Sequence, residues 1–204
     1  MAIAKYLNPK NDVAFKKKKP KILFLDVESS PDVAVTFKRF KANMSQEHIL
    51  QGGGWLLSIA YAFNEGEVIS SSLTPSQACA NDDSQLVAEL WCAIEEADLV
   101  VAHNCDRFDI PLFKARCVIN GFAPPKRVKQ VDTLKLAKQM KFQSNRLDSL
   151  GYVLGEGSKI KHSGIDLWIK CMEGDPEALN TMEEYNRQDV VLLRNVYHRL
   201  KAFD

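Results

Sequence analysis

The sequence lacks the features that would place it in three large classes of protein. None of its five cysteines belongs to a Cys-x-x-Cys pair, and their odd number and wide spacing favour reduced thiols over a disulfide framework or a zinc site. No apolar run approaches the roughly 20 residues that a membrane helix needs. The charges near the start follow a weak apolar stretch, which is the reverse of a secretory signal. We therefore expect a cytoplasmic protein without a membrane partner.

The chain also lacks internal repeats and low-complexity linkers, so its 204 residues are expected to form one domain. Residues 1–20 are the exception, because this basic leader ends in four consecutive lysines and Pro20, and we expect it to be loosely ordered. Its lysines suit either a solvated tail or contact with a phosphate backbone. A hydrophobic fraction of 46% and a charged fraction of 26% are typical of a globular domain, expected over residues 21–204.

Hydrophobic periodicity predicts an α/β fold for this domain. The first part alternates apolar and polar residues as strands do, and from Asp82 the period changes to the 3.6 residues of amphipathic helices. This order predicts a mixed five-stranded sheet, with a three-strand antiparallel meander and then parallel strands, flanked by helices. The expected strand segments are 21–27, 33–40, 55–63, the stretch after Glu65–Gly66, 98–103 and 127–133. The expected helices are one from Leu86 to Ala97, then 108–121, about 133–141, 146–154, 164–173 and about 176–202.

Two carboxylates lie on one face of the first predicted strand. Because side chains alternate along a strand, Asp26 and Glu28 project side by side, about 6–7 Å apart, at the carboxyl end of the segment. Ligands of open α/β sheets bind outside such ends. Two converging carboxylates repel each other unless a cation or a proton lies between them. The pair indicates either a cation site or an exposed strand end with ordinary solvated acids.

Two further acids occupy unusual positions. Asp109 follows a buried strand and opens a helix, where it could bind a ligand or cap the helix. Asp189 interrupts the core-facing stripe of the last helix, and a buried, ionised carboxylate requires a partner such as a metal ion. Pairing with Arg187 or Arg194 is the alternative, although both arginines lie at other angles of the helix. Tyr185 lies one turn before Asp189, so its hydroxyl can approach whatever Asp189 binds.

These residues form three motifs in order: Asp-x-Glu on a strand, Asn-x-x-x-Phe-Asp at a strand-to-helix junction, and Tyr-x-x-x-Asp on the last helix. The sequence thereby resembles the 3′–5′ exonucleases of the ribonuclease H-like (DnaQ-like) superfamily that carry four acidic residues. The tyrosine resembles the subtype found in family-B polymerase proofreading domains, whereas the sister subtype has a histidine where Glu184 stands here. The resemblance covers about residues 21–200 and implies a ribonuclease H-like fold.

The resemblance implies a role for each acidic residue and for the tyrosine. It makes Asp26, Glu28, Asp109 and Asp189 the ligands of two divalent ions, with Asp26 touching both ions. It makes Tyr185 the residue that holds the attacking water. The ions would be Mg²⁺ or Mn²⁺, because hard cations prefer carboxylate oxygens whereas zinc prefers histidine or cysteine.

The resemblance also implies which residues line the substrate cleft. Asn104 and Phe108 match cleft positions of the family, and Ser29 stands where a threonine commonly follows the first motif. His103 is interpreted as a packed or cleft-lining histidine and not as a ligand. Residues 126–161 carry nine basic residues against three acids, which suits either a phosphate track or an ordinary solvated face.

The leading hypothesis is therefore a metal-dependent 3′–5′ exonuclease that removes nucleotides from the 3′ end of single-stranded DNA by a two-metal mechanism. Such an enzyme would proofread or trim ends in repair or recombination, in trans to a DNA polymerase or a recombination protein. A second hypothesis keeps the site but makes RNA the substrate. The third is a catalytically inactive module that binds nucleic acid or a replication partner, although clustered negative charge facing a phosphate backbone argues against it. Trp168 suits either core packing or stacking on a base.

Overall fold

The structure is a computed structural model that describes residues 19–37, 40, 43–158 and 164–203. The basic leader predicted for residues 1–20 therefore lies outside the described residues, apart from Lys19 and Pro20. Within the described part, every helix is too short or too polar to cross a lipid bilayer.

A mixed five-stranded sheet forms the centre of the fold, and this confirms the predicted α/β class. Its spatial order is β5-β4-β1-β6-β7. Strand β1 pairs antiparallel with β4 on one side and parallel with β6 on the other, so the meander β1-β4-β5 continues into the parallel strands β6 and β7. The strands are β1 (Ile22–Ser29), β4 (Leu56–Phe63), β5 (Ile69–Ser72), β6 (Leu99–Ala102) and β7 (Lys129–Asp132).

The strand expected at 33–40 does not belong to this sheet, so that part of the prediction was wrong. Only Val33–Ala34 are extended, as β2, and they pair with β3 (Ile49–Gln51) in a separate two-stranded sheet. The physical reason is that β1 already has a partner on each edge, β4 and β6, and offers no free edge to the segment that follows it. The alternating apolar residues of 33–40 therefore do not pack against the main sheet as a sixth strand.

The helices largely match the predicted segments. They are α1 (Pro75–Ala80), α2 (Ser84–Glu96), α3 (Asp109–Ile119), α4 (Thr133–Lys138), α5 (Leu147–Leu154), α6 (Ile165–Met172) and α7 (Pro176–Leu200), with short 3-10 turns η1 (Gln46–His48) and η2 (Lys201–Phe203). Helix α7 begins as expected, because the Asp175 side chain accepts hydrogen bonds from the backbone of Glu177 and Ala178. Helix α1 was missed; a capping box between Thr74 and Gln77 starts it.

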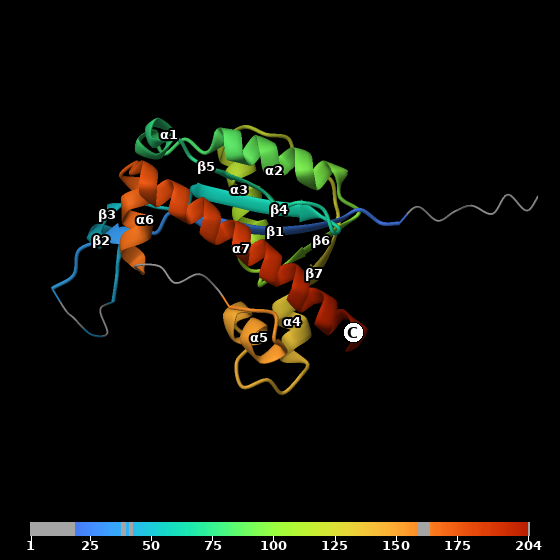
Figure 1. The fold of residues 1–204 in the computed structure, drawn as a ribbon. Coiled ribbons are helices and arrows are strands. Elements are labelled where there is room, and N and C mark those ends of the chain that lie inside the picture. Colours follow the sequence, from blue (N-terminus) through green and yellow to red (C-terminus); the bar gives the residue numbers. More distant parts are fainter. Residues whose placement is uncertain (1–18, 38–39, 41–42, 159–163, 204) are drawn as a thin grey trace, which may run out of the picture.

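The sheet is covered by α2 on one face and by α7 on the other (Figure 1). On the α7 face, the ring of Phe24 packs edge-on against Tyr197 with 5.4 Å between centroids. On the opposite face, burial, and next the charge of Glu89 on α2, raise the pKa of Tyr61 to about 12. Helices α4, α5 and α6 contact α7 and not the middle of the sheet. The long helix α7 therefore links the sheet to the smaller helices.

A buried ion pair connects the two helices on the α2 side to the sheet. Asp83, which is fully buried, accepts hydrogen bonds of 2.6 and 2.8 Å from the guanidinium of Arg116 on α3. The same carboxylate accepts from the Asn120 side chain and from the backbone of Leu56 at the start of β4, each at 2.8 Å. Because its oxygens are satisfied, this charge is tolerated in the core.

Candidate metal centre

The candidate centre begins with the two acids of β1. Asp26 and Glu28 project from the same face of the strand, as strand alternation predicts, and both are partly buried. Their neighbours across the ladder on β4 are Ala60 and Ser58, two small residues. Small side chains at these positions leave room for α7 to cross the sheet closely beside the two carboxylates.

The third acid, Asp189, comes from the middle of α7 and is fully buried. One carboxylate oxygen from each of Asp26, Glu28 and Asp189 lies within 4.8 Å of the others. The arginines considered as partners of Asp189 point elsewhere: Arg187 donates to Ser70 at 2.7 Å, and Arg194 donates to the Gly66 carbonyl at 2.7 Å. Strand β1 and helix α7, which are far apart in the sequence, therefore place three carboxylates close together beside the sheet.

This donor set fits a hard divalent cation. Three carboxylate oxygens at this spacing repel one another strongly in a partly buried site, and a doubly charged ion removes that repulsion. Cys171 lies near Glu28, but burial first, and then the charges of Asp175 and Glu28, raise the pKa of its thiol to about 12. The thiol thus stays neutral at physiological pH and offers no soft thiolate ligand. Oxygen-preferring ions such as Mg²⁺ or Mn²⁺ match the site better than zinc does.

The fourth predicted ligand, Asp109, is not one of the three carboxylates that converge within 4.8 Å. It is the first residue of α3 and is almost fully buried, at 2% exposure. The N-cap position of α3 is Phe108, which makes no side-chain capping bond. A role for Asp109 as a metal ligand therefore stays a prediction.

Tyr185 lies one turn before Asp189 on α7 and is 6% exposed. The ring of Trp168 on α6 packs edge-on against it, with 6.2 Å between centroids. Trp168 therefore holds the tyrosine ring in place, and this contact corresponds to the core-packing alternative for Trp168. Tyr185 also reaches the wall of a cavity, so its phenol lies at the boundary between protein interior and solvent-accessible space.

That cavity has a volume of about 670 Å³ and lies between the residues that follow β6, helices α4 and α5, and Tyr185 of α7. Asn104, one of the residues that the resemblance places in the substrate cleft, lines it, as do Tyr185 and His103. The Nδ1 atom of His103 lies 2.9 Å from the Thr133 hydroxyl. His103 is thus a cleft-lining residue held by a neighbour. Asn104 has a left-handed backbone with φ of 70°, a conformation that asparagine tolerates better than most residues.

Only part of the basic stretch faces this cavity. Lys138 and Arg146 line it, whereas Lys135 pairs with Asp106 and the Lys126 side chain donates to the backbone of Glu95. The cavity also contains Asn145, which sequence reasoning missed. Its Oδ1 is buried and accepts no hydrogen bond from any described residue. The cavity therefore combines two cations and one acid, Asp148, with an acceptor that remains available to a ligand.

Two predicted cleft residues lie further from the cavity. Phe108 is 42% exposed just before α3. Ser29 lines a second, smaller cavity of about 330 Å³, which it shares with Trp168. Neither residue lines the larger cavity.

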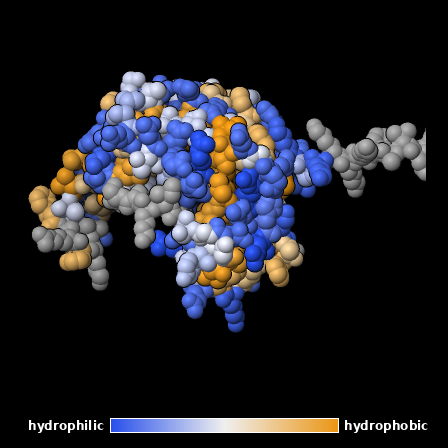
Figure 2. Space-filling view, in the orientation of Figure 1, coloured by the Kyte–Doolittle hydropathy of each residue, from blue (hydrophilic) through white to orange (hydrophobic). Residues whose placement is uncertain are grey.

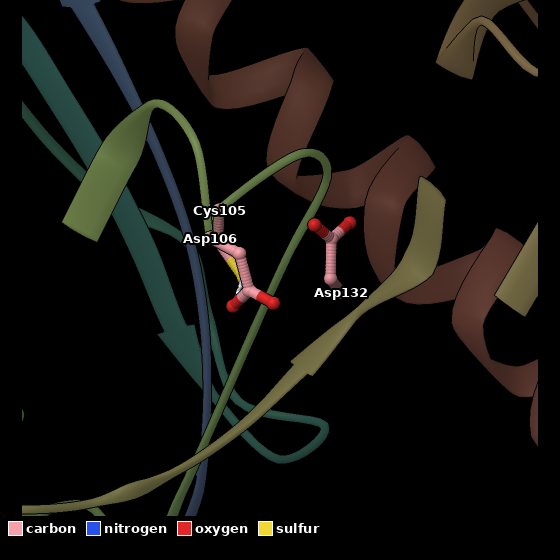
Figure 3. A group of neighbouring side chains, drawn as sticks. All are labelled: Cys105, Asp106 and Asp132. Atoms are coloured by element: carbon pink, nitrogen blue, oxygen red, sulfur yellow. Dashed lines mark hydrogen bonds between the residues drawn. The ribbon is translucent and has the colours of Figure 1, made fainter. Parts of the chain in front are cut away.

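A second group of possible ligands, Cys105, Asp106 and Asp132, lies at the ends of β6 and β7 (Figure 3). Its members already have structural roles. Asp132 accepts from the backbone of Asn104 at 2.8 Å and caps α4 through Leu134, while Asp106 pairs with Lys135. Burial, and next the charge of Asp132, raise the pKa of the Cys105 thiol well above its usual range. This group is a set of turn and cap contacts and not a metal site.

Comparisons with known proteins identify the family and the fold of the chain. A family model described as the RNase H superfamily matches residues 51–201, a range that contains Asp109, Tyr185 and Asp189 but not β1. A search of the curated proteins found no match. The solved structure of the family B DNA polymerase from the hyperthermophilic archaeon Pyrobaculum calidifontis superposes with a TM-score of 0.67 and 14% identity over 91% of this chain. The chain spans about a quarter of that polymerase, at 25% coverage, so at this identity the likeness shows the fold.

Proposed function

The chain belongs to the RNase H superfamily, and from this premise we propose that it is a metal-dependent 3′–5′ exonuclease acting on single-stranded DNA. Membership of this superfamily supports nuclease activity. The observation that carries the proposal is the approach of Asp26, Glu28 and Asp189 to within 4.8 Å of one another. Clustered negative charge is costly and would repel a phosphate backbone, so its retention beside a cleft favours catalysis over passive binding.

In this proposal Asp26, Glu28 and Asp189 hold divalent metal, and Asp109 joins them from α3. Two ions, Mg²⁺ or Mn²⁺, would supply charge stabilisation for the entering and departing oxygens of the phosphodiester and lower the pKa of the attacking water. The protein contributes placement. Strand β1 fixes two carboxylates through its ladders with β4 and β6, and α7 fixes the third in a fully buried position.

Tyr185 orients the attacking water in the proposed reaction. Its hydroxyl lies on the same face of α7 as Asp189, and Trp168 packs edge-on against its ring at 6.2 Å. A neutral phenol can donate one hydrogen bond and accept another without adding charge. Holding the water in line with the scissile bond is an orientation effect, and we expect it to raise kcat.

The strand is proposed to enter the larger cavity. Lys138 and Arg146 would bind backbone phosphates, and the Asn145 Oδ1 would accept a hydrogen bond from a base or a sugar hydroxyl. DNA is favoured as the substrate because one solved structure of similar fold is that of a DNA polymerase. Single-stranded 3′ ends arise in proofreading, repair and recombination. In these processes the protein would act together with a polymerase or a recombination protein.

The test is hydrolysis of a single strand that carries a label at its 5′ end, in the presence of Mg²⁺ or Mn²⁺. A ladder that shortens from the 3′ end supports the proposal, and a chelator should stop the reaction. The Asp26→Asn variant should be inactive but folded, whereas Glu184→Gln, which changes an exposed acid of α7, should retain activity.

Other outcomes identify other functions. Faster turnover of a matched RNA strand would make the protein an exoribonuclease, and internal cuts would indicate an endonuclease on the same scaffold. No hydrolysis, together with no heat of Mn²⁺ binding in calorimetry, would leave an inactive binding module and refute the proposal.

A further inference from the structure

Helix α7 carries a stripe of polar side chains on the side that faces the sheet. Glu183, Asn186 and Asp189 follow one another at intervals of three residues, so they lie along one side of the helix. The surface in Figure 2 is largely hydrophilic, as expected of a folded domain, but Asn186 and Asp189 are fully buried and Glu183 is partly buried. Buried polar side chains destabilise a fold unless they are hydrogen-bonded, so each member of this polar stripe needs a partner.

A matching row of polar side chains crosses the sheet beneath α7. Ser72 of β5 pairs with Ser58 of β4, and Ser58 pairs with Glu28 of β1. Directly paired residues point to the same face of a sheet, so these three side chains lie side by side. Helix α7 covers this face, because the Glu183 carboxylate accepts hydrogen bonds from Ser70 at 2.8 Å and from Ser72 at 3.0 Å. The polar stripe of α7 therefore faces a polar row of the sheet.

The two ends of the polar stripe fix how α7 crosses the sheet (Figure 1). The two serines of β5 hold Glu183 over that strand, and Asp189 lies beside the two acids of β1. Strand β4 lies between β5 and β1, and Asn186 lies midway between Glu183 and Asp189 on the helix. The crossing therefore places Asn186 over β4, at the row that contains Ser58.

Asn186 and Ser58 are both fully buried, and neither side chain has a hydrogen-bond partner within the described part of the chain. The atoms concerned are Oδ1 and Nδ2 of Asn186 and Oγ of Ser58. Polar atoms left in this state would destabilise the fold. A buried water molecule typically makes about three hydrogen bonds to such groups. The three atoms of these two side chains therefore match the bonding capacity of one water molecule.

We propose that a buried water molecule bridges Asn186 to Ser58, and that Asn186 acts through this bridge as a positioning residue for the metal centre. The inference rests on the proposed function, which makes Asp189 and Glu28 metal ligands. Asn186 lies three residues before Asp189, and Ser58 is paired with Glu28, so the bridge joins the two elements that carry these acids. Hydrogen bonds are directional, whereas apolar packing is not, so the bridge fixes the register of α7 on the sheet. It thereby sets the spacing of the two carboxylates, as outer hydrogen bonds do in metal sites.

The first measurement is thermal unfolding in a chelator, where bound metal does not contribute to stability. Ser58→Ala removes one hydroxyl without adding volume. If that hydroxyl binds the bridging water, the melting temperature should fall by about 2–6 °C. If the hydroxyl has no partner in the folded protein, the same change removes an unsatisfied buried group and the melting temperature should rise. The direction of the shift therefore decides whether the bridge exists.

A double-mutant cycle tests whether the two side chains share one bridge. Asn186→Leu replaces the amide by an apolar group with the same branching, and it should also lower the melting temperature. Because either change alone breaks the bridge, the double variant should lose less than the sum of the two single losses. A crystal structure should show one water molecule about 2.7–3.2 Å from the polar atoms of both side chains.

Calorimetry with Mn²⁺ alone separates a positioning role from a merely structural one. Ser58→Ala and Asn186→Leu should each weaken Mn²⁺ binding by about tenfold or more. The matched control is Ser71→Ala, which breaks a 2.8 Å hydrogen bond from Ser71 to Glu89 of α2. Ser71 alternates with Ser70 and Ser72 along β5 and so lies on the opposite face from α7. The control should also lower the melting temperature, but its Mn²⁺ affinity should equal that of the wild-type protein.

Four outcomes would overturn the proposal: a higher melting temperature for Ser58→Ala, additive losses in the double variant, a direct bond between the two side chains without a water molecule, or unchanged Mn²⁺ affinity in both single variants. Failure of the wild-type protein to cut any strand would refute the proposed function itself. That result is distinct, because the unfolding shifts and the Mn²⁺ affinities are measured without a nucleic-acid substrate.

Discussion

Asparagine in place of Asp189 should stabilise the metal-free protein and remove its response to metal. The Asp189 carboxylate lies within 4.8 Å of two others, and at an effective dielectric constant of about 20 each such pair of full charges repels by about 3.5 kcal/mol. The repulsion cannot cost more than about 4 kcal/mol at pH 7, because one carboxylate would otherwise bind a proton. Protonating a carboxyl with an ordinary pKa of about 4 at pH 7 costs about three units of 1.36 kcal/mol each. After allowing for hydrogen bonds that asparagine makes less well, we expect a net gain of about 1–3 kcal/mol.

The assay is thermal unfolding in a chelator and in saturating Mn²⁺. In the chelator, Asp189→Asn should melt several degrees above wild type, since each kcal/mol is worth about 2–4 °C in a chain of this size. Added Mn²⁺ at a hundred times its dissociation constant should stabilise the wild-type protein by about 2.7 kcal/mol. Mn²⁺ should stabilise the variant much less than the wild-type protein, so the difference between their melting temperatures should shrink or change sign. The variant should also lose hydrolytic activity.

The matched control is Glu184→Gln on the same helix, where the exposed carboxylate only accepts a hydrogen bond from Gln188 and lies 3.7 Å from Arg187. Its stability should change by less than about 0.5 kcal/mol in either condition. If Asp189→Asn melted below wild type in the chelator, or if Mn²⁺ shifted both proteins equally, the three acids would not form a repulsive metal site and the reasoning would fail.

Three further outcomes are expected. Tyr185→Phe should lower kcat by about ten- to a hundredfold with unchanged Mn²⁺ affinity in calorimetry; an unaltered rate would exclude a role in holding the water. Asp83→Ala should cost about 3–5 kcal/mol in urea unfolding because it leaves Arg116 buried without its carboxylate, and a loss below about 1 kcal/mol would contradict this. Burial first, and then Asp83, raise the pKa of Cys117 from 9.0 to about 11, so the folded protein retains a proton that the unfolded chain loses. Stability should therefore fall by about 1.4 kcal/mol per pH unit between about pH 9 and pH 11, and Cys117→Ala should flatten that slope; an equal slope in the variant would show that other groups cause it.

Local chemistry made much of the fold predictable from the sequence. Alternation along residues 21–29 placed Asp26 and Glu28 on one face, and the stripe of α7 placed Tyr185 and Asp189 one turn apart. The start of α7 was evident from Asp175 and the proline after it. These features depend on neighbours within a turn or a strand, which the order of residues determines directly.

Features that depend on distant partners were not predictable in this way. The segment 33–40 has a strand-like pattern, but whether it joins the sheet depends on β1 having two other partners. Asp109 was grouped with the other acids by resemblance, and its position relative to them depends on how α3 packs. The role of Asn145 in the cavity depends on the approach of α5 to α7, which leaves no signal in the sequence.

The metal centre joins the first strand of the described fold to its last long helix, since Asp26 and Glu28 lie on β1 and Asp189 lies on α7. During synthesis on a ribosome, Asp26 and Glu28 are made long before Asp189, because residues 29–188 lie between them. Contacts between such distant positions form late and slowly in folding. A nascent or truncated chain that ends before α7 thus carries no assembled centre, and hydrolysis would begin only once translation of that helix is complete.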